Sequence, residues 1–439
     1  MGLLSLRRGA PQLARQTALL FAVDMATNAV DYGFHIYVGR ALTPGDFAIV
    51  QTVNAMVIIA MTVFGVLQPV VARFVTESQV REDAGRSAES VRSILHAFWR
   101  HALWAGLALT AILWLGQEPL ARWLNVPPFA VRLTASIALF ALLRPVVGGI
   151  LQGRERFVAF GLTRSAYALG RVAAGVALIS LGMGAAGALV SMPIGGALAV
   201  LCGLAFLGFA IWKPAPKLAP HRLSQGLRLS LAAFVAFAAY MLLLNNDLIW
   251  ANRSFTAELA GGYATAVLLR RVVTLLPGAV VVTMYPRAVA QVAQGRLPDR
   301  LLALTSAAVA VSGALLALFF WGLGPAMIRL AFGPSYAAAG PLLGGMAAAM
   351  VGYTLASIWM NFFLAVKPWP FAALLVITAI VQYGLLAAFH ATPGQVMAIF
   401  GVCGWVLAAG GAILYLAWLR PALRAGRIGA DAPAMVTAP

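Results

Sequence analysis

Residues 13–38 read LARQTALLFAVDMATNAVDYGFHIYV, an apolar stretch interrupted by Asp24, Asn28, Asp31 and His35. The intervals between these four residues are four, three and four, so on a helix they form one stripe. A helix of this length can span a bilayer, and a carboxylate near the middle of such a span rarely faces lipid. The stretch therefore predicts a membrane-spanning first helix whose polar stripe faces other protein or a water-filled cavity.

The whole chain has the composition of a polytopic membrane protein. Its 439 residues are 62% hydrophobic and only 10% charged, although the formal net charge is +18. The basic residues lie mostly at the ends of apolar segments, so this charge does not indicate a nucleic-acid partner. Cys202 and Cys403 lie in separate apolar segments without ligand spacing, so neither a metal site nor a disulfide framework is predicted.

The hydropathy pattern predicts about twelve transmembrane helices and hence an all-α polytopic membrane protein. Arg7, Arg8 and Arg15 precede the first apolar run, but Asp24 and Asp31 interrupt it, so we expect a retained first helix rather than a cleaved signal peptide. The predicted spans are 13–38, 47–76, 93–115, 129–151, 158–181, 185–212, 227–251, 261–286, 301–322, 340–366, 370–389 and 394–419.

Basic residues alternate between the two ends of these spans. Arginine and lysine cluster before the first span, after each even-numbered span, and in the C-terminal tail, whereas the other connections hold only isolated arginines. Loops rich in these residues stay in the cytoplasm. The alternation therefore predicts that both termini are cytoplasmic.

The chain also repeats itself. At an offset of 216 residues, Asp31 falls on Asp247 and Gly45 on Gly261. At offsets of 213 to 214, a second set of positions matches: Leu151 with Leu364, Arg154 with Lys367, and Phe157 with Phe371. Six spans return the chain to the same side of the membrane, so the two halves have the same orientation, and a parallel repeat places the substrate path between two bundles. We therefore predict an N-terminal six-helix bundle over 1–212, a cytoplasmic linker over 213–226, a C-terminal six-helix bundle over 227–419, and a cytoplasmic tail over 420–439.

Several short motifs, in order along nearly the whole chain, resemble the polysaccharide-transporter family of lipid-linked oligosaccharide flippases. This family lies within the multidrug/oligosaccharidyl-lipid/polysaccharide exporter superfamily. The motifs are Gly39–Phe47 (GRALTPGDF, with Thr43 where the family often has Gly), Leu151–Phe157 (LQGRERF), Asp247 followed by Ala260–Tyr263, Arg270 and Tyr285–Arg287, and Phe332–Tyr336 (FGPSY).

The resemblance implies a V-shaped exporter fold of two six-helix bundles in a bacterial inner membrane. It implies a flippase that moves an undecaprenyl-diphosphate-linked oligosaccharide, such as an O-antigen or exopolysaccharide repeat unit, to the outer leaflet by alternating access. The implied partners are this lipid-linked substrate, membrane lipids, and the polysaccharide polymerase and glycosyltransferases of the same pathway.

An anionic diphosphate crossing an apolar layer needs cations in a wet cavity, and arginine binds phosphate through a planar fork. Arg164 and Arg171 lie seven residues apart on the fifth predicted helix, with Tyr167 between them, and Arg144 lies in the fourth. Arg171 is about 20 Å from the start of its helix, near the middle of the membrane. These four residues are the main candidates for cargo binding, although each arginine could instead pair with a carboxylate or a helix end.

The remaining charged residues of the spans suggest ion pairing, gating or coupling. Asp247 lies at a depth similar to that of Arg270 and Arg271, which predicts an ion pair between helices seven and eight. The functional interpretation of these residues is an outer gate or a cargo site. Asp31 could meet Arg270 or Arg271 when the outer side closes. Asp24 could bind H⁺ or Na⁺, or pair with Arg171. Asn28 and His35 share its stripe as packing, coupling or proton-relay residues, and no cofactor is expected.

Two further patterns have a packing interpretation beside a functional one. Tyr353, Ser357 and Asn361 give the tenth helix a polar face that could contact sugar hydroxyls or join helices. Glycines in the sixth and twelfth helices, including Gly195 and Gly404, predict close helix packing.

Two other function classes compete with the flippase. Another twelve-helix transporter is the first, either a drug exporter coupled to H⁺ or Na⁺ or a major-facilitator porter, although Asp83–Arg86 is only a weak echo of the major-facilitator loop. A glycosyltransferase or polymerase is the second, but the external loops are short and no nucleophile–base arrangement appears. We therefore predict a transporter rather than an enzyme.

The topology can be checked directly. Reporter fusions placed after Gln225 and after Pro439 should both report a cytoplasmic location. A periplasmic signal from either fusion would contradict the twelve-span count.

Overall fold

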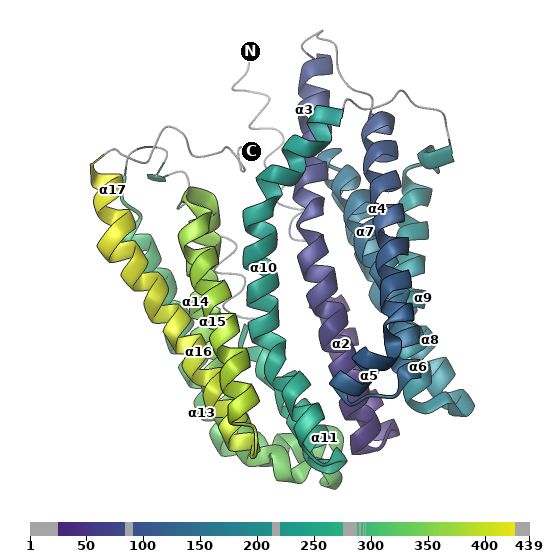
Figure 1. Ribbon diagram of the computed structural model, residues 1–439, viewed down its shortest axis with the longest axis vertical. Helices are drawn as coiled ribbons and strands as arrows, with labels where there is room; N and C mark the ends of the chain where they lie inside the picture. Colours follow the sequence, from purple (N-terminus) through teal and green to yellow (C-terminus); the bar gives the residue numbers. More distant parts are fainter. Residues whose placement is uncertain are drawn as a thin grey trace. The chain divides into compact units, whose positions relative to one another are not determined.

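The computed structural model describes residues 25–83, 91–212, 220–274, 288, 291–292, 294 and 296–425 (Figure 1). Almost all of these residues are helical, and none of them lies in a strand. The predicted all-α class is therefore confirmed.

The chain divides into two compact units. The first consists of Met1–Leu42 and Met56–Ser230, and the second of Thr43–Ala55 and Leu231–Pro439. A helix over 25–41 opens the described part of the first unit, and α2 (Pro44–Gly65) begins in the second unit and ends in the first. The predicted bundle and linker boundaries stay a prediction.

The helices that follow α2 in the first unit are α3 (Leu67–Asp83), α4 (Val91–Leu115), α5 (Gln117–Leu124), α6 (Pro128–Ala135), α7 (Ile137–Gly153), α8 (Phe157–Leu178), η1 (Ile179–Met183), α9 (Gly184–Phe206) and η2 (Ala210–Trp212). The later helices are α10 (Pro220–Ser254), α11 (Ala257–Arg270), η3 (Arg271–Thr274), α13 (Asp299–Phe332), η4 (Pro334–Ala339), α14 (Gly340–Val366), α15 (Pro368–Ala388), α16 (Pro393–Leu414), η5 (Tyr415–Leu419) and α17 (Arg420–Arg424).

Within the described ranges, nine helical segments are long and apolar enough to cross a membrane. One of them, Phe157–Phe206, contains both the fifth and the sixth predicted spans, which meet at a kink where Gly182 and Gly184 have φ of +86° and +53°. Ten of the twelve predicted spans are thus accounted for. The first is described from residue 25 and the eighth as far as Thr274, so the rest of each lies outside the described residues.

The core of the first unit forms where α7 packs against α3 and α4. Branched side chains such as Val71, Val146 and Ile150 are fully buried there. Gly149 allows the close approach, because a Cβ at this position would lie 2.6 Å from the backbone oxygen of Gln68. Gly153 has the same role against the oxygen of Ala72. The LQGRERF motif therefore begins as a helix-packing element.

The same motif then closes a tight connection between α7 and α8. Glu155 adopts a φ of +56°, and Arg156 donates a hydrogen bond to the carbonyl of Phe206 at the end of α9. Gln152 accepts a hydrogen bond from Gln68 of α3 at 2.8 Å. This motif therefore holds α3, α7 and α9 together at the end predicted to be cytoplasmic.

Two other motifs of the family resemblance meet in the second unit. The rings of Phe47, Phe332 and Tyr336 lie with each pair of centroids 5.8 Å apart, and all three side chains are buried. Thr43 caps α2, since its hydroxyl accepts a hydrogen bond from the Asp46 amide and donates one to the Asp46 carboxylate. The start of α2 therefore packs with the second unit, and Thr43 has a capping function where the family often has glycine.

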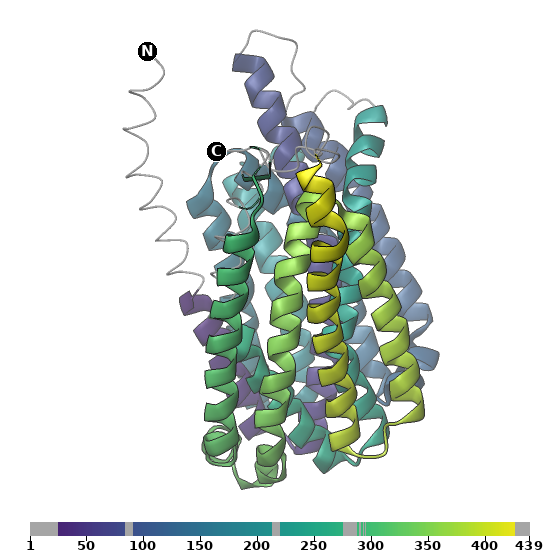
Figure 2. The same cartoon turned by 90° about the vertical axis from the view of Figure 1, so that its left-hand side faces the viewer.

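Long helices run side by side in the second unit, where α14 packs against both α13 and α16 (Figure 2). Gly404 permits the contact with α16, since a Cβ there would lie 2.7 Å from the ring of Tyr353. In the first unit, Gly195 of α9 similarly approaches the backbone oxygen of Tyr167. The predicted packing role of these two glycines is confirmed.

Replacing Gly149 tests the packing of the first unit. We expect Gly149→Ala to reduce the free energy of unfolding by about 1–3 kcal/mol, because the added methyl group forces α7 away from the α3 backbone. Thermal unfolding of the purified protein measures this. Gly65→Ala is the control, since nothing lies within 4 Å of a Cβ at that position, and it should leave stability unchanged or raise it. Equal stability of both variants would contradict the packing argument.

Candidate functional site

Polar side chains inside the predicted membrane spans collect in one group in each unit. The first unit contributes Asp31, His35, Arg144, Arg164, Tyr167 and Arg171, and the second contributes Asn245, Asp247, Tyr263, Arg270 and Arg271. No cluster of metal-ligating side chains was found among the described residues. The two groups differ in how their charges are neutralised.

Asp31 pairs with Arg171 in the first unit. Nη1 of Arg171 donates to Oδ1 of Asp31 at 3.1 Å, and Nε2 of His35 lies 3.7 Å from Oδ2 of the same carboxylate. The Arg171 side chain is buried, whereas the Asp31 side chain is 33% exposed. The pair thus joins the helix over 25–41 to α8.

This pairing gives Asp31 a partner within its own unit, Arg171 of α8. A meeting of Asp31 with Arg270 or Arg271 when the outer side closes stays a prediction. Thr27 contacts Ser165 at 3.2 Å one turn before the pair, so the helix over 25–41 and α8 lie side by side and run in the same direction. The expected partner of Arg171, Asp24, lies outside the described residues. Its coupling role stays a prediction, as does that of Asn28, whose side chain is exposed.

Arg144 has a different environment from Arg171. Its Nη1 contacts the Met61 sulfur at 2.8 Å, and its guanidinium carbon lies 4.4 Å from the centroid of the Tyr167 ring. Arg164 lies close enough to Arg144 for their charges to repel. No carboxylate in the described ranges forms an ion pair with Arg144. A partly buried guanidinium with a cationic neighbour and no carboxylate is suited to an anionic ligand.

Arg164 and Tyr167 complete this group on α8. Arg164 is exposed, and its guanidinium lies 5.9 Å from the centroid of the Phe160 ring. Tyr167 lies one turn further along α8 and offers its ring face to Arg144. The structure therefore brings together Arg144, Arg164 and Tyr167, three of the predicted cargo residues, and places Arg171 one turn beyond Tyr167 on the same helix.

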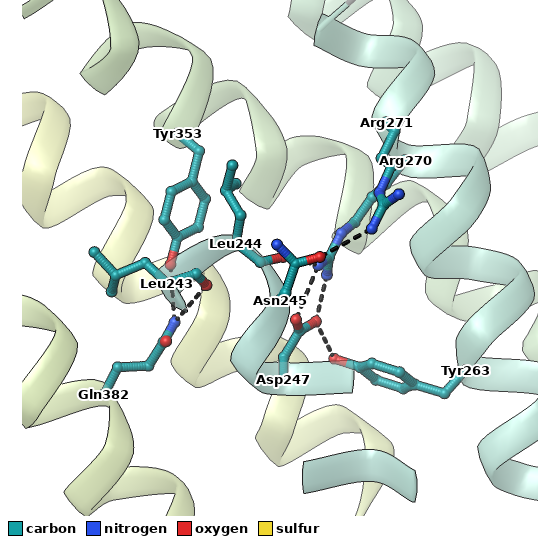
Figure 3. A network of polar contacts seen from close by, with 9 residues as sticks. All are labelled: Leu243, Leu244, Asn245, Asp247, Tyr263, Arg270, Arg271, Tyr353 and Gln382. Carbon is teal, nitrogen blue, oxygen red and sulfur yellow. Dashed lines mark hydrogen bonds and ion pairs between the residues drawn. The ribbon is translucent and has the colours of Figure 1, made fainter. Parts of the chain in front are cut away.

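Asp247 and Arg270 form a fully buried pair in the second unit (Figure 3). Nη2 of Arg270 donates to Oδ1 of Asp247 at 2.9 Å, and Nη1 contacts Oδ2. The hydroxyl of Tyr263 donates to Oδ2 at 2.8 Å, and the carbonyl of Leu244 accepts from Arg270 at 3.0 Å. The side chains of Asp247 and Arg270 are 0% and 1% exposed. Of the two predicted pairings, the one with Arg270 is confirmed.

Neighbouring contacts extend this polar network. Arg271 donates to Oδ1 of Asn245 at 2.9 Å. Gln382 of α15 donates to the Tyr353 hydroxyl at 2.9 Å and to the Leu243 carbonyl at 3.3 Å. The sequence did not single out Asn245 or Gln382, although an amide side chain inside an apolar span is a signal of such contacts. The network ties together α10, α11, α14 and α15.

The predicted polar face of α14 is mostly internal. Tyr353 is fully buried, Ser357 donates to the Thr354 carbonyl at 2.6 Å, and Asn361 donates to the Ser357 carbonyl at 2.8 Å. The hydroxyl of Tyr240 donates to the backbone oxygen of Tyr353 at 2.8 Å. These contacts favour the packing interpretation over contact with sugar hydroxyls.

Comparison with known proteins agrees with this arrangement. The model of the family described as polysaccharide biosynthesis protein matches residues 13–291. The chain belongs to this family. A search of curated proteins gave no match.

Solved structures with the same fold are transporters. An inward-facing multidrug resistance MATE family transporter of the MOP superfamily superposes with a TM-score of 0.71 at 14% identity, covering 91% of this chain and 95% of the other. The lipid II flippase MurJ in an inward closed conformation gives 0.72 at 12% identity, covering 91% and 87%. A MOP superfamily transporter from Pyrococcus furiosus gives 0.58 at 15% identity, covering 94% and 95%. The predicted exporter fold is confirmed by these similarities. The family and the apolar helical segments identify a multi-pass membrane protein of the polysaccharide biosynthesis family.

The buried pair of the second unit can be tested by charge removal. Arg270→Gln leaves Asp247 as an uncompensated buried charge, which is expected to cost about 3–5 kcal/mol and to deplete the protein from the membrane. Arg270→Gln combined with Asp247→Asn should recover abundance. Quantitative immunoblotting of membranes measures both variants.

Arg171→Gln is the matched comparison in the first unit. It should cost less, because the Asp31 side chain that it leaves behind is 33% exposed. An Arg270→Gln variant as abundant as the wild type would show that the buried pair does not hold the second unit together.

Proposed function

We propose that the protein is a flippase that moves a diphosphate-linked lipid oligosaccharide, such as an O-antigen or exopolysaccharide repeat unit, from the inner to the outer leaflet of a bacterial inner membrane. Membership of the polysaccharide biosynthesis family and the fold shared with a lipid II flippase support this proposal. The observation on which it rests most is the group formed by Arg144, Arg164 and Tyr167. Within this group, Arg144 forms no ion pair with a carboxylate of the described residues, so its guanidinium fits an anionic headgroup.

Arg144 is the residue assigned to the diphosphate. Its planar guanidinium can donate two parallel hydrogen bonds to phosphate oxygens, and Arg164 adds a second positive charge. The face of the Tyr167 ring holds the guanidinium of Arg144 through a cation–π contact. Arg171 is already paired with Asp31, so we assign it to positioning within the first unit.

The Asp31–His35–Arg171 group is the candidate for gating or for coupling to H⁺ or Na⁺. Asp31 contacts both Arg171 and His35, so a proton or cation that binds to its carboxylate would compete with both contacts. In the second unit, the complete burial of the Asp247–Arg270 ion pair favours a structural role. Gating by Asp247 and cargo binding by Arg270 or Arg271 remain the alternatives.

The proposed setting follows from the same reasoning. Both termini lie in the cytoplasm, and the glycosyltransferases that build the substrate and the polymerase that uses it act in the same pathway. The competing class is another twelve-helix transporter, and the positive charge of Arg144 would disfavour a cationic drug as its cargo.

Arg144 provides the test of the proposal. Arg144→Gln should reduce glycan export to less than about a tenth, since one lost charge-assisted contact is worth roughly 1.5–3 kcal/mol. Arg144→Lys should keep part of the activity, because a point charge replaces the fork. Surface glycan in a strain that lacks the native gene measures both.

Stability distinguishes this role from a structural one. Removing Arg144 leaves no carboxylate unpaired and removes a buried charge, so the variant should accumulate like the wild type and be at least as stable to unfolding. Arg122→Gln, which alters an exposed arginine in α5, is the control and should export normally. Full export by Arg144→Gln would place the anion site elsewhere.

A further inference from the structure

A basic and aromatic stripe lies along α4. Arg92, His96, Arg100 and Trp104 follow one another at intervals of four residues, so they share one side of the helix. Arg92 and Arg100 are exposed, and Trp104 is 66% exposed. The opposite side of α4 carries Ile94, Leu95, Phe98 and Ala102, which are buried against the core that includes α7. The stripe therefore faces away from the core of the first unit.

Beyond Trp104, the same exposed side of α4 is apolar. It presents Leu107, Ile112, Trp114 and Leu115, with 65% of Ile112 and 77% of Leu115 exposed. Large apolar side chains exposed on a spanning helix lie against acyl chains. The basic stripe is therefore continuous with a lipid-facing surface.

The uncharged part of α4 is too short to cross a bilayer unaided. It runs from Ala102 to Leu115, which is about 21 Å of helix against a hydrocarbon core of about 30 Å. In α13, by contrast, no charged residue lies between Arg300 and Arg329, a stretch of about 42 Å. Because this part of α4 is shorter than the hydrocarbon core is thick, Arg100 starts inside the apolar layer. Its guanidinium reaches the headgroup boundary only if the side chain extends outward or the bilayer thins locally.

Arg100 itself is available for a ligand. No ion pair or hydrogen bond joins its guanidinium to the described part of the chain. His101 is held to its own helix, with Nδ1 at 2.7 Å from the Ala97 carbonyl. Trp104, one turn deeper than Arg100, and Trp212 of η2, which contacts α4, are both strongly exposed. Exposed tryptophans mark the headgroup level of a membrane.

We propose that this side of α4 binds the phosphate of an anionic phospholipid of the inner leaflet, with Arg100 as the residue that contacts it. The site rests on the cytoplasmic placement of the start of α4 given under the proposed function. Arg92 extends the positive charge toward the water, and His96 offers a ring nitrogen between the two arginines. Trp104 packs beside the glycerol and upper acyl region. The site is separate from the Arg144 group and serves the membrane around the protein rather than the cargo.

Lipid binding by the purified protein tests the proposal. The probes are dioleoyl phosphatidylglycerol and dioleoyl phosphatidylcholine, added to the detergent-solubilised chain and measured by native mass spectrometry. The wild type should bind the phosphatidylglycerol more tightly. Arg100→Gln should weaken that binding about fivefold and remove the preference, whereas Arg100→Lys should keep most of it. Arg122→Gln is the control and should match the wild type.

Two outcomes would overturn the proposal. One is an Arg100→Gln variant with the wild-type preference for phosphatidylglycerol. The other is an Arg100→Gln variant that loses affinity for undecaprenyl diphosphate but not for phosphatidylglycerol. That result would make the stripe a surface for the cargo. Because the assay measures binding and requires no transport, its result can contradict the lipid-site proposal without contradicting the flippase proposal. Likewise, a loss of the flippase proposal in the export assay would not affect the result for the lipid site.

Discussion

A charge inside an apolar layer must be paired, hydrated or given an ionic ligand, and this constraint explains how the arginines of this chain differ. Arg270 is fully buried, with its charge neutralised by Asp247 and a backbone carbonyl as a further acceptor. Arg171 is buried, but its partner Asp31 is partly exposed. Arg144 has a sulfur, an aromatic ring and a second cation as neighbours. The three arginines thus differ in how far other protein groups neutralise their charge. Arg270 is paired completely, whereas Arg144 is suited to a ligand.

The internal repeat makes this gradation informative. Asp31 and Asp247 occupy matching positions at the 216-residue offset, yet their partners come from different helices of their units. The position that matches Arg270 is Asn54, a buried amide in the second unit, so Asp31 has no arginine at the matching position with which to pair. Its carboxylate uses Arg171 of α8 instead. The two matching carboxylates therefore lie in different environments. Packing encloses the Asp247–Arg270 pair completely, whereas Asp31 stays partly exposed.

The sequence was sufficient for the parts of the structure that depend on local pattern. Apolar length identified the spans, and matched depth identified the Asp247–Arg270 pair. It was not sufficient for contacts that depend on the register between distant helices. Asp31 and Arg171 are 140 residues apart, and which turn of α8 faces Asp31 is decided by packing such as the Thr27–Ser165 contact. The meeting of Phe47 with Phe332 and Tyr336 was hidden for the same reason, although both motifs had been recognised.

The distribution of charge also bears on what a flippase with this site would recognise. Burying a guanidinium without a carboxylate has a free-energy cost of several kcal/mol, and an anionic ligand offsets part of that cost when it binds. The offset depends on the phosphate oxygens and not on the sugars attached to them. Recognition at Arg144 would therefore be common to all cargo that carries a diphosphate. Discrimination between glycans must arise from contacts spread over other helices, where polar groups recognise sugar hydroxyls rather than charge.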